Sequence, residues 1–365
     1  MADLKIIRHI KEGAEHWNAW REKTHPEAID LQKADLSGLK LSGVNLSQVN
    51  LSKANFNRTD LAYANLEAAN LTGVSFANTN LKGANLSAAI LEQVNLGQAN
   101  LQDVNLTKTN LRSLELRGLN LGSTNLSGAD LRGMNLNGAN FKKTNLSGAN
   151  LSSANLQNAD LSGANLSNIN LNNAKLSRAN LRGALLTRAN LYGALLDFAD
   201  MSMAACLMAN FGEAILNKAT LNNANLGGAI LSGAQLVGAE LSNTFLNDAF
   251  LSMANLTKAN LSDADLSHAY LYRAILSQSI CINTKFCQTE MEEADLSMAN
   301  LRQANFSGAN LRKAYCCGAD LSGTVLTNTN LENANLANAN LTEAVTESTI
   351  WTGANLEGAI GVTEK

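Results

Sequence analysis

The chain has 365 residues, of which 16% are charged and 5% aromatic, and its 28 basic and 31 acidic residues give a formal net charge of −3. This balance excludes a strongly basic nucleic-acid-binding protein and argues against a strongly acidic mimic of nucleic acid. No apolar run reaches the roughly 18 residues of a membrane-spanning helix, so we expect no membrane partner. Five cysteines without regular spacing indicate a reducing, cytoplasmic location rather than a disulfide framework.

Residues 1–28 are predicted to form a short N-terminal α-helical cap. Ile7, Ile10 and Trp17 follow helical spacing with charged residues between them, and Trp20 extends the apolar stripe. A regular repeat array begins after this segment, and the end of such an array exposes core side chains and unpaired backbone. We interpret the four apolar residues as the contacts of a structural lid; a binding role for this segment is the alternative.

A repeat of five residues follows. From position 31 to position 356 a large apolar residue, here the centre, occupies every fifth position in 66 consecutive pentapeptides, and leucine fills 53 of these centres. Two positions before the centre lies a small residue, usually alanine, and between them lies the outward residue, usually Asn or Asp. The two residues after the centre are the first and second turn residues. Residues 145–149, Asn-Leu-Ser-Gly-Ala, show the unit.

A period of five fits neither a helix face, which repeats about every 3.6 residues, nor a strand face, which repeats every two. It does fit a short extended piece followed by a tight turn. In the extended piece the centre and the small residue point the same way, and the outward residue points oppositely. Twenty of the 26 glycines are second turn residues, where a positive φ is expected. The sequence therefore predicts a solenoid that turns a corner every five residues and keeps its leucines inside.

These A-(D/N)-L-x-x units resemble the pentapeptide repeat proteins over about nine-tenths of the chain. The resemblance implies an all-β solenoid, namely a right-handed quadrilateral β-helix of about 16 coils with four pentapeptides in each coil. We expect this domain to span residues 29–358 and a polar tail to follow at residues 359–365. Thr346 and Trp351 replace core leucines near this end, so the C-terminal cap is either short or supplied by a second copy of the chain.

No residue pattern points to a catalytic site, a cofactor or a metal. None of the four histidines has a partner at a spacing that suggests a metal pair or a nucleophile. Cys206, Cys281 and Cys316 are centres and are expected in the core, whereas Cys287 and Cys317 belong to non-adjacent sides of a four-sided coil. Phosphate-binding loops and dinucleotide fingerprints are lacking as well. The sequence predicts a protein that is not an enzyme.

In one segment the outward residue is often neither Asn nor Asp. Between positions 30 and 180, 26 of 31 outward residues are Asn or Asp, but between 185 and 280 only 7 of 20 are, and ten are apolar. Residues twenty apart share a column, and a contiguous apolar column on a surface indicates a protein-binding or dimer face. Tolerance of any residue at this position is the alternative. The candidate interface residues are Ile215, Ile230, Phe245, Phe250, Tyr270 and Ile275.

Two functions remain. One is a non-catalytic scaffold that binds an unidentified protein partner, or a second copy of itself as a homodimer, through rigid outer sides. The other is implied by the resemblance alone: some pentapeptide repeat proteins, a family abundant in bacteria, mimic B-form DNA and bind type II topoisomerases such as gyrase. A mimic needs continuous negative columns, whereas this chain scatters basic residues such as Arg112, Arg132 and Arg188 among its acids. We therefore favour the scaffold and expect no direct binding of nucleic acid.

Overall fold

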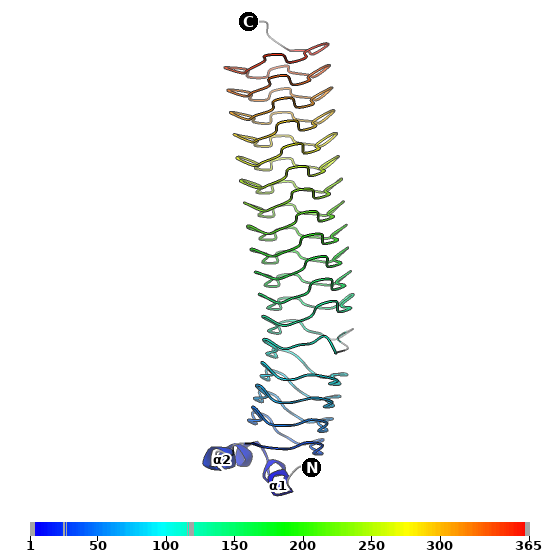
Figure 1. Cartoon of the computed structure of the whole chain (residues 1–365), viewed down its shortest axis with the longest axis vertical. Coiled ribbons are helices and arrows are strands. Elements are labelled where there is room, and N and C mark those ends of the chain that lie inside the picture. The colour runs from blue at the N-terminus through cyan, green and yellow to red at the C-terminus, as the bar shows by residue number, and fades with distance from the viewer. Residues whose placement is uncertain (1–3, 25, 27, 115, 117–119, 362–365) are drawn as a thin grey trace. The chain divides into compact units, whose positions relative to one another are not determined.

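The computed structural model of the chain divides into two compact units, Met1–Asn170 and Leu171–Lys365. The residues that the structure describes are 4–24, 26, 28–114, 116 and 120–361. Two helices, α1 (Leu4–Lys11) and α2 (Ala14–Thr24), lie at the start of the first unit (Figure 1). In the described part of the chain, neither is long and apolar enough to cross a membrane.

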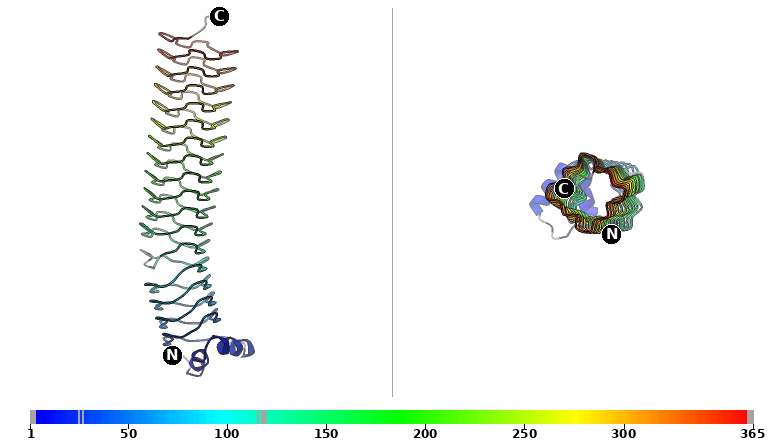
Figure 2. Two further views of the ribbon diagram at one scale, coloured as in Figure 1. Left: turned by 180° about the vertical axis from the view of Figure 1, so that it is seen from behind. Right: turned by 90° about the horizontal axis from the view of Figure 1, so that it is seen from above.

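Outside these helices, each pentapeptide that the structure describes in full is one extended piece and one β-turn. In the repeat centred on Leu146, the N–H of Ala149 donates to the Leu146 carbonyl oxygen at 3.0 Å and closes the turn. The outward residue pairs in parallel with the outward residue twenty positions on, as Asn145 does with Asn165. Each coil therefore takes four pentapeptides. Within each unit the coils stack on one another, as the further views in Figure 2 show.

The outward Asn or Asp completes the hydrogen bonding of the backbone. In residues 145–149, four of the five N–H groups donate to backbone carbonyl oxygens at 2.8–3.0 Å. The fifth, that of Ser147, donates to the side-chain Oδ1 of Asn145 at 3.2 Å. Asn145 also donates from Nδ2 to Oδ1 of Asn125 in the previous coil at 3.1 Å. Since a buried or half-buried N–H needs an acceptor, this bond explains why Asn and Asp dominate the outward position.

The second turn residue has a positive φ, as the glycine pattern predicts. Gly148 has a φ of 65°, and among the described residues the same left-handed conformation extends to 45 that are not glycine, whose φ values run from 52° to 62°. Lys33 and Phe198 are examples. An L-residue in this conformation is disfavoured by about 1 kcal/mol relative to glycine. The ladder of hydrogen bonds between coils therefore imposes the turn on whatever residue stands there.

The centres form the core of both units. Every centre from Leu31 to Leu341 is buried, and phenylalanine centres one coil apart stack their rings, as Phe286 and Phe306 do at 4.8 Å between centroids. Threonine can replace alanine as the small residue because its hydroxyl finds a carbonyl acceptor. A cavity among the centres between residues 296 and 336 has a volume of about 10 Å³. This is at the limit of what holds one water, so the leucines meet in this part of the interior.

The N-terminal segment consists of two helices rather than one continuous helix. The apolar residues keep helical spacing on both sides of Gly13. Gly13 itself has a φ of 110°, which is not helical, so the chain forms two helices, α1 and α2. Of the predicted contact residues, Ile10 and Trp17 are fully buried, whereas Ile7 and Trp20 are half-buried.

Polar side chains of α2 bond to the backbone of the first coil. Trp17 Nε1 and Arg21 Nη1 each donate to the Asn45 carbonyl oxygen at 2.7 Å. Arg21 Nη2 donates to the Ser47 carbonyl oxygen at 2.7 Å, and Asn18 Oδ1 accepts the N–H of Asn45 at 2.8 Å. In later coils these backbone groups bond to the preceding coil. Side chains of α2 therefore provide hydrogen-bond partners for backbone N–H and carbonyl groups of the first coil, which has no preceding coil to bond to.

The last described coil is less buried than the others. Thr346, Trp351 and Leu356 are three of its four centres, and all three are only half-buried. The pairing continues to Ile360, which bridges to Asn340. The rest of the predicted tail, residues 362–365, lies outside the described residues.

Candidate protein-binding side

Three of the six candidate interface residues form one column on the second unit. Ile230 bridges to Phe250 and Phe250 to Tyr270, and the two aromatic rings stack with centroids 5.1 Å apart and planes 4° apart. All three side chains are exposed, by 41–45%. We call these three residues the aromatic column; it is bounded by Asn210 below and Glu290 above.

The other three candidates lie on other columns. Phe245 bridges to Asn225 and Asp265 and so belongs to the side that precedes the aromatic column in each coil. Ile215 bridges to Gln235, and Ile275 bridges to Asn255, on the side that follows it. Gln235 and Asn255 separate the two isoleucines along their column, so these residues do not join the aromatic column or each other.

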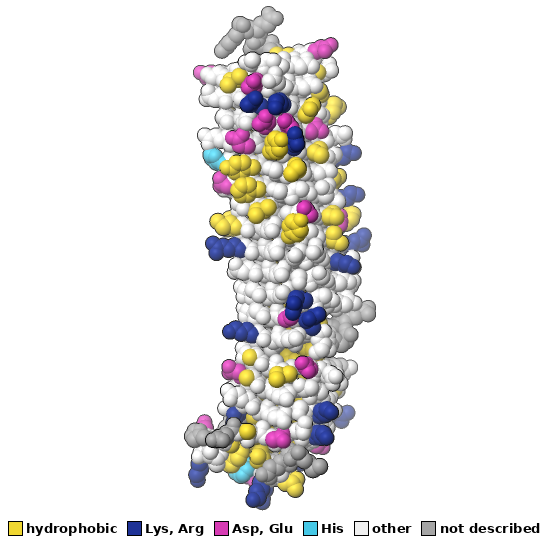
Figure 3. All heavy atoms as spheres, viewed as in Figure 1, with side chains coloured by type: hydrophobic (Ala, Val, Ile, Leu, Met, Phe, Trp, Pro, Cys, Tyr) yellow, Lys and Arg dark blue, Asp and Glu magenta, His cyan; other side chains and the backbone are white. Residues whose placement is uncertain are grey.

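Large apolar residues also occupy turn positions, which the pattern of outward residues does not cover. Met253 and Tyr272 follow the aromatic column at its corner and are 60% and 39% exposed, and Leu207 and Met208 occupy the corner on its other side at 40% and 61%. The signal is present in the sequence, because a polar residue or glycine usually stands at these positions. In Figure 3, hydrophobic side chains gather on the coils of the second unit between charged groups.

The aromatic column forgoes hydrogen bonds that the regular repeat makes. Its side chains cannot accept the N–H of the first turn residue as Asn145 does for Ser147. Within the described residues, the N–H groups of Ser232, Ser252 and Tyr272 have no acceptor on the chain. A hydrogen bond of this kind contributes about 1 kcal/mol. The column thus lowers the stability of the fold while it places apolar surface in solvent, which favours a role in binding over a role in folding.

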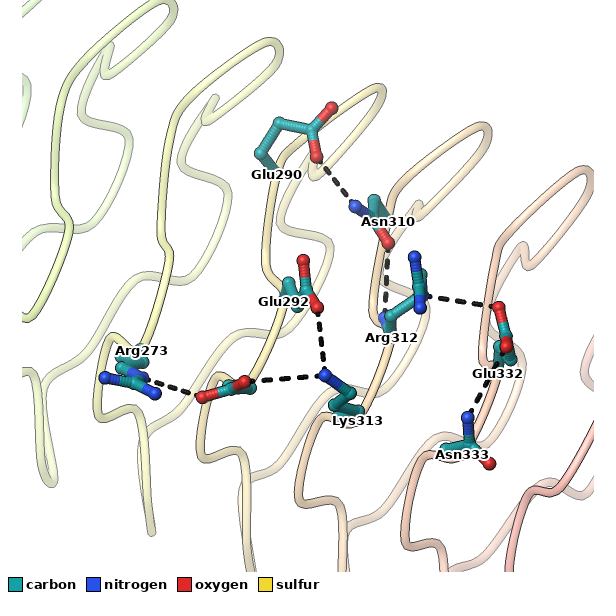
Figure 4. A network of polar contacts seen from close by, with 9 residues as sticks. Arg273, Glu290, Glu292, Asn310, Arg312, Lys313, Glu332 and Asn333 are labelled. Atoms are coloured by element: carbon teal, nitrogen blue, oxygen red, sulfur yellow. Dashed lines mark hydrogen bonds and ion pairs between the residues drawn. The ribbon is translucent and has the colours of Figure 1, made fainter.

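Charged residues beside this column neutralise one another. Arg273 donates from Nε to Glu293 at 2.7 Å, and Lys313 lies 3.5 Å from Glu292 and 3.8 Å from Glu293 (Figure 4). The hydrogen bond from Arg273 lowers the pKa of Glu293, which keeps that carboxylate ionised. Glu292 and Glu293 are therefore each paired with a basic side chain and do not extend a continuous negative column.

Two histidines that the sequence spacing left unpaired meet in the first unit. His9 Nδ1 lies 2.9 Å from His16 Nε2, and Glu12 Oε2 lies 3.2 Å from the same His16 atom. Seven residues of one continuous helix would separate the two rings by about 10 Å, so the contact depends on the break at Gly13. In the described part of the chain, no group of three or more histidine, cysteine or acidic residues could hold a metal ion.

The cysteines are all free thiols. Cys206, Cys281 and Cys316 are buried, and burial raises the pKa of Cys281 to about 12. Burial raises the pKa of Cys206 as well. A thiol that stays protonated is a poor nucleophile and a poor metal ligand, so these side chains act as small apolar residues of the core.

Comparison with known proteins identifies the repeat. A family model described as pentapeptide repeats matches the chain. The matched residues are 29–62, 50–87, 59–98, 89–128, 124–163, 164–202, 207–233, 234–271, 269–308 and 309–345. A search among curated proteins finds no match.

Solved structures of other proteins are similar to the chain. HetL, a pentapeptide repeat protein involved in heterocyst differentiation regulation in the cyanobacterium Nostoc sp. strain PCC 7120, is 34% identical over 64% of this chain and 92% of HetL, with a TM-score of 0.34. A pentapeptide repeat protein of the Arabidopsis thaliana thylakoid lumen is 31% identical over 33% of this chain and 70% of that protein, with a TM-score of 0.23. QnrB1, a plasmid-mediated fluoroquinolone resistance protein, is 19% identical over 51% of this chain and 85% of QnrB1, with a TM-score of 0.30.

Proposed function

The chain belongs to the pentapeptide repeat family, and on this premise we propose that it is a non-catalytic scaffold that binds a protein partner through the aromatic column of its second unit. The observation that carries the proposal is the exposed stack of Ile230, Phe250 and Tyr270, held on a backbone that is hydrogen-bonded from coil to coil. Aromatic side chains are enriched at protein interfaces and contribute much of their binding energy.

The rigidity of the coils adds to this argument. The backbone of Phe250 donates to Ala229 and accepts from Leu231, both at 2.7–2.9 Å, so the residue is fixed before any partner arrives. Association then requires little ordering of this surface, which lowers the entropy that binding must offset. Met253 and Tyr272 enlarge the apolar area at the corner, and the neutralised charges beside it form a polar rim.

The same proposal includes the finer architecture. We infer a right-handed quadrilateral β-helix of about 16 coils over residues 29–358, with residues 1–28 acting as a structural lid. The bonds from Trp17, Asn18 and Arg21 to the first coil support the lid. The chain needs no cofactor for this role, and a reducing cytoplasm suits its free thiols.

A topoisomerase-binding DNA mimic is the second candidate. It draws only on the family resemblance, and the charge pattern of the second unit opposes it, because Arg273 and Lys313 neutralise Glu292 and Glu293. An assay of gyrase supercoiling separates the two functions. The scaffold leaves supercoiling unchanged at micromolar concentrations, whereas inhibition would favour the mimic.

The direct test uses two matched variants as baits in the native host. The double variant Phe250→Asn/Tyr270→Asn removes the aromatic column but restores the usual outward residue. Tyr63→Asn removes an aromatic side chain from the first unit that is 64% exposed, more than Phe250 at 44% or Tyr270 at 45%. We expect the natural chain and the Tyr63 variant to retain one partner at constant stoichiometry and the double variant to lose it. Retention of that partner by a folded double variant would reject the proposal.

A further inference from the structure

A second surface of the second unit is built differently from the aromatic column. Four outward residues in consecutive coils, Leu185, Ala205, Asn225 and Phe245, bridge one to the next on the side that precedes the column. The two end residues are exposed, by 47% for Leu185 and 53% for Phe245, and the two middle residues are small or polar. The side therefore carries one large apolar group at each end of a four-coil segment.

The corner after this side carries two large apolar side chains in one coil and two glycines in the next. Leu207 and Met208 occupy one turn, and Gly227 and Gly228 occupy the turn directly above it. A Cβ atom on Gly227 would lie 3.2 Å from the Leu207 side chain, and one on Gly228 would lie 3.7 Å from that of Met208. Gly227 is itself buried, so the Leu207 side chain lies over this turn, which has no side chains of its own.

Opposite charges flank these two turns. The second turn residues of the same four coils are, in order, Arg188, Met208, Gly228 and Asp248. Arg188 and Asp248 are exposed, and among the described residues neither makes an ion pair. Three coils separate them, about 14 Å at the spacing of paired strands, so they are too far apart to pair within one chain.

The arrangement is self-complementary, and we propose that the chain forms an antiparallel homodimer through these four coils. The surface comprises Leu185, Arg188, Leu207, Met208, Phe245 and Asp248 with the two glycines, and we call it the dimer side. A two-fold axis in the interface plane, between the second and third of these coils, brings Leu185 opposite the partner's Phe245. It also brings Arg188 opposite the partner's Asp248. Leu207 and Met208 then lie opposite the partner's Gly227 and the partner's Gly228, and symmetry makes every contact twice.

The spacing of the coils favours a second copy over other occupants. Two copies have the same spacing between coils, about 4.8 Å, so each of the four coils stays level with one coil of the partner across the interface. An α-helix advances about 5.4 Å per turn and would drift out of alignment over the same length. The ion pairs lie at the edges of an apolar contact, as in other specific interfaces. Because the aromatic column is not part of the dimer side, partner binding and self-association are separable.

The test is a charge swap measured by sedimentation velocity on the full chain. The natural protein should sediment as a dimer of 38.7 kDa subunits at micromolar concentrations. Arg188→Asp and Asp248→Arg should each weaken the dimer by about tenfold or more, because each places like charges face to face twice. The double variant Arg188→Asp/Asp248→Arg should restore it, since the opposite charges then meet in reversed order.

Two further variants complete the design. Phe245→Asn should give a monomer, whereas Phe250→Asn/Tyr270→Asn should remain a dimer and lose only the partner. Circular dichroism of each variant verifies folding. A natural protein that is monomeric at tens of micromolar, a single reversal without effect, or a double reversal that fails to restore the dimer would each overturn the proposal.

Discussion

The hydrogen bond from the outward side chain can be tested by a series at Asn145. In Asn145→Ala, the N–H of Ser147 loses its acceptor at 3.2 Å, and the bond to Asn125 at 3.1 Å is lost with it. In Asn145→Asp the acceptor remains and only the donor to Asn125 disappears. At about 1 kcal/mol for each bond, the alanine variant should lose about 2 kcal/mol and the aspartate variant about half of that.

The assay is the free energy of local opening, from amide-resolved hydrogen exchange at Ser147 and its neighbours in the adjoining coils. A local measurement is chosen because long repeat arrays can unfold in parts. Ser147→Ala is the matched control, because it keeps the backbone N–H and the Asn145 acceptor. Equal losses in the alanine and aspartate variants, or no loss in either, would refute the reasoning that backbone pairing selects Asn and Asp.

Three other predictions concern the core and the turns. Leu146→Ala should lower the free energy of unfolding by about 3 kcal/mol or more in urea titrations, because the leucine is fully buried and its hydrogen-bonded neighbours cannot close the gap; the Ser147→Ala control should stay within about 0.5 kcal/mol. Gly148→Ala should destabilise and Ser153→Gly should stabilise, each by about 1 kcal/mol, since both positions have a positive φ; shifts of the same sign would contradict this. Burial raises the pKa of Cys281 from 9.0 to about 12, so the unfolded thiol ionises first and stability falls as pH rises from 9 to 12; the fall should be smaller in Cys281→Val, and an equal fall in both proteins would contradict the assignment.

Much of the fold is readable because a period of five leaves few options for the backbone. The centres and small residues alternate with outward residues, and the glycines mark the turn, so the residues of the interior follow from their positions in the repeat. The positive φ of 45 non-glycine residues in the described part of the chain could not be predicted in the same way. Nothing in the local preference of Lys33 or Phe198 favours that conformation; the bonds to the next coil impose it.

The aromatic column was predictable because a spacing of twenty converts sequence position into a column. Ile215 and Ile230 are fifteen positions apart, which is not a multiple of twenty, so the same rule places them on different sides. Leu207 and Met208 were missed because only outward positions were compared. The contact between the two N-terminal histidines depends on a helix break, and neighbouring residues in the sequence do not reveal how two short helices fold against each other.

Amide-resolved hydrogen exchange, with and without the captured partner, tests the central claim most directly. In the free chain, the N–H groups of Ser232, Ser252 and Tyr272 lack an acceptor among the described residues and should exchange much faster than that of Ser147. Partner binding should slow these three amides and their neighbours along the aromatic column while Ser147 stays unchanged. Protection that appears on another side of the second unit, or only in the first unit, would contradict the account.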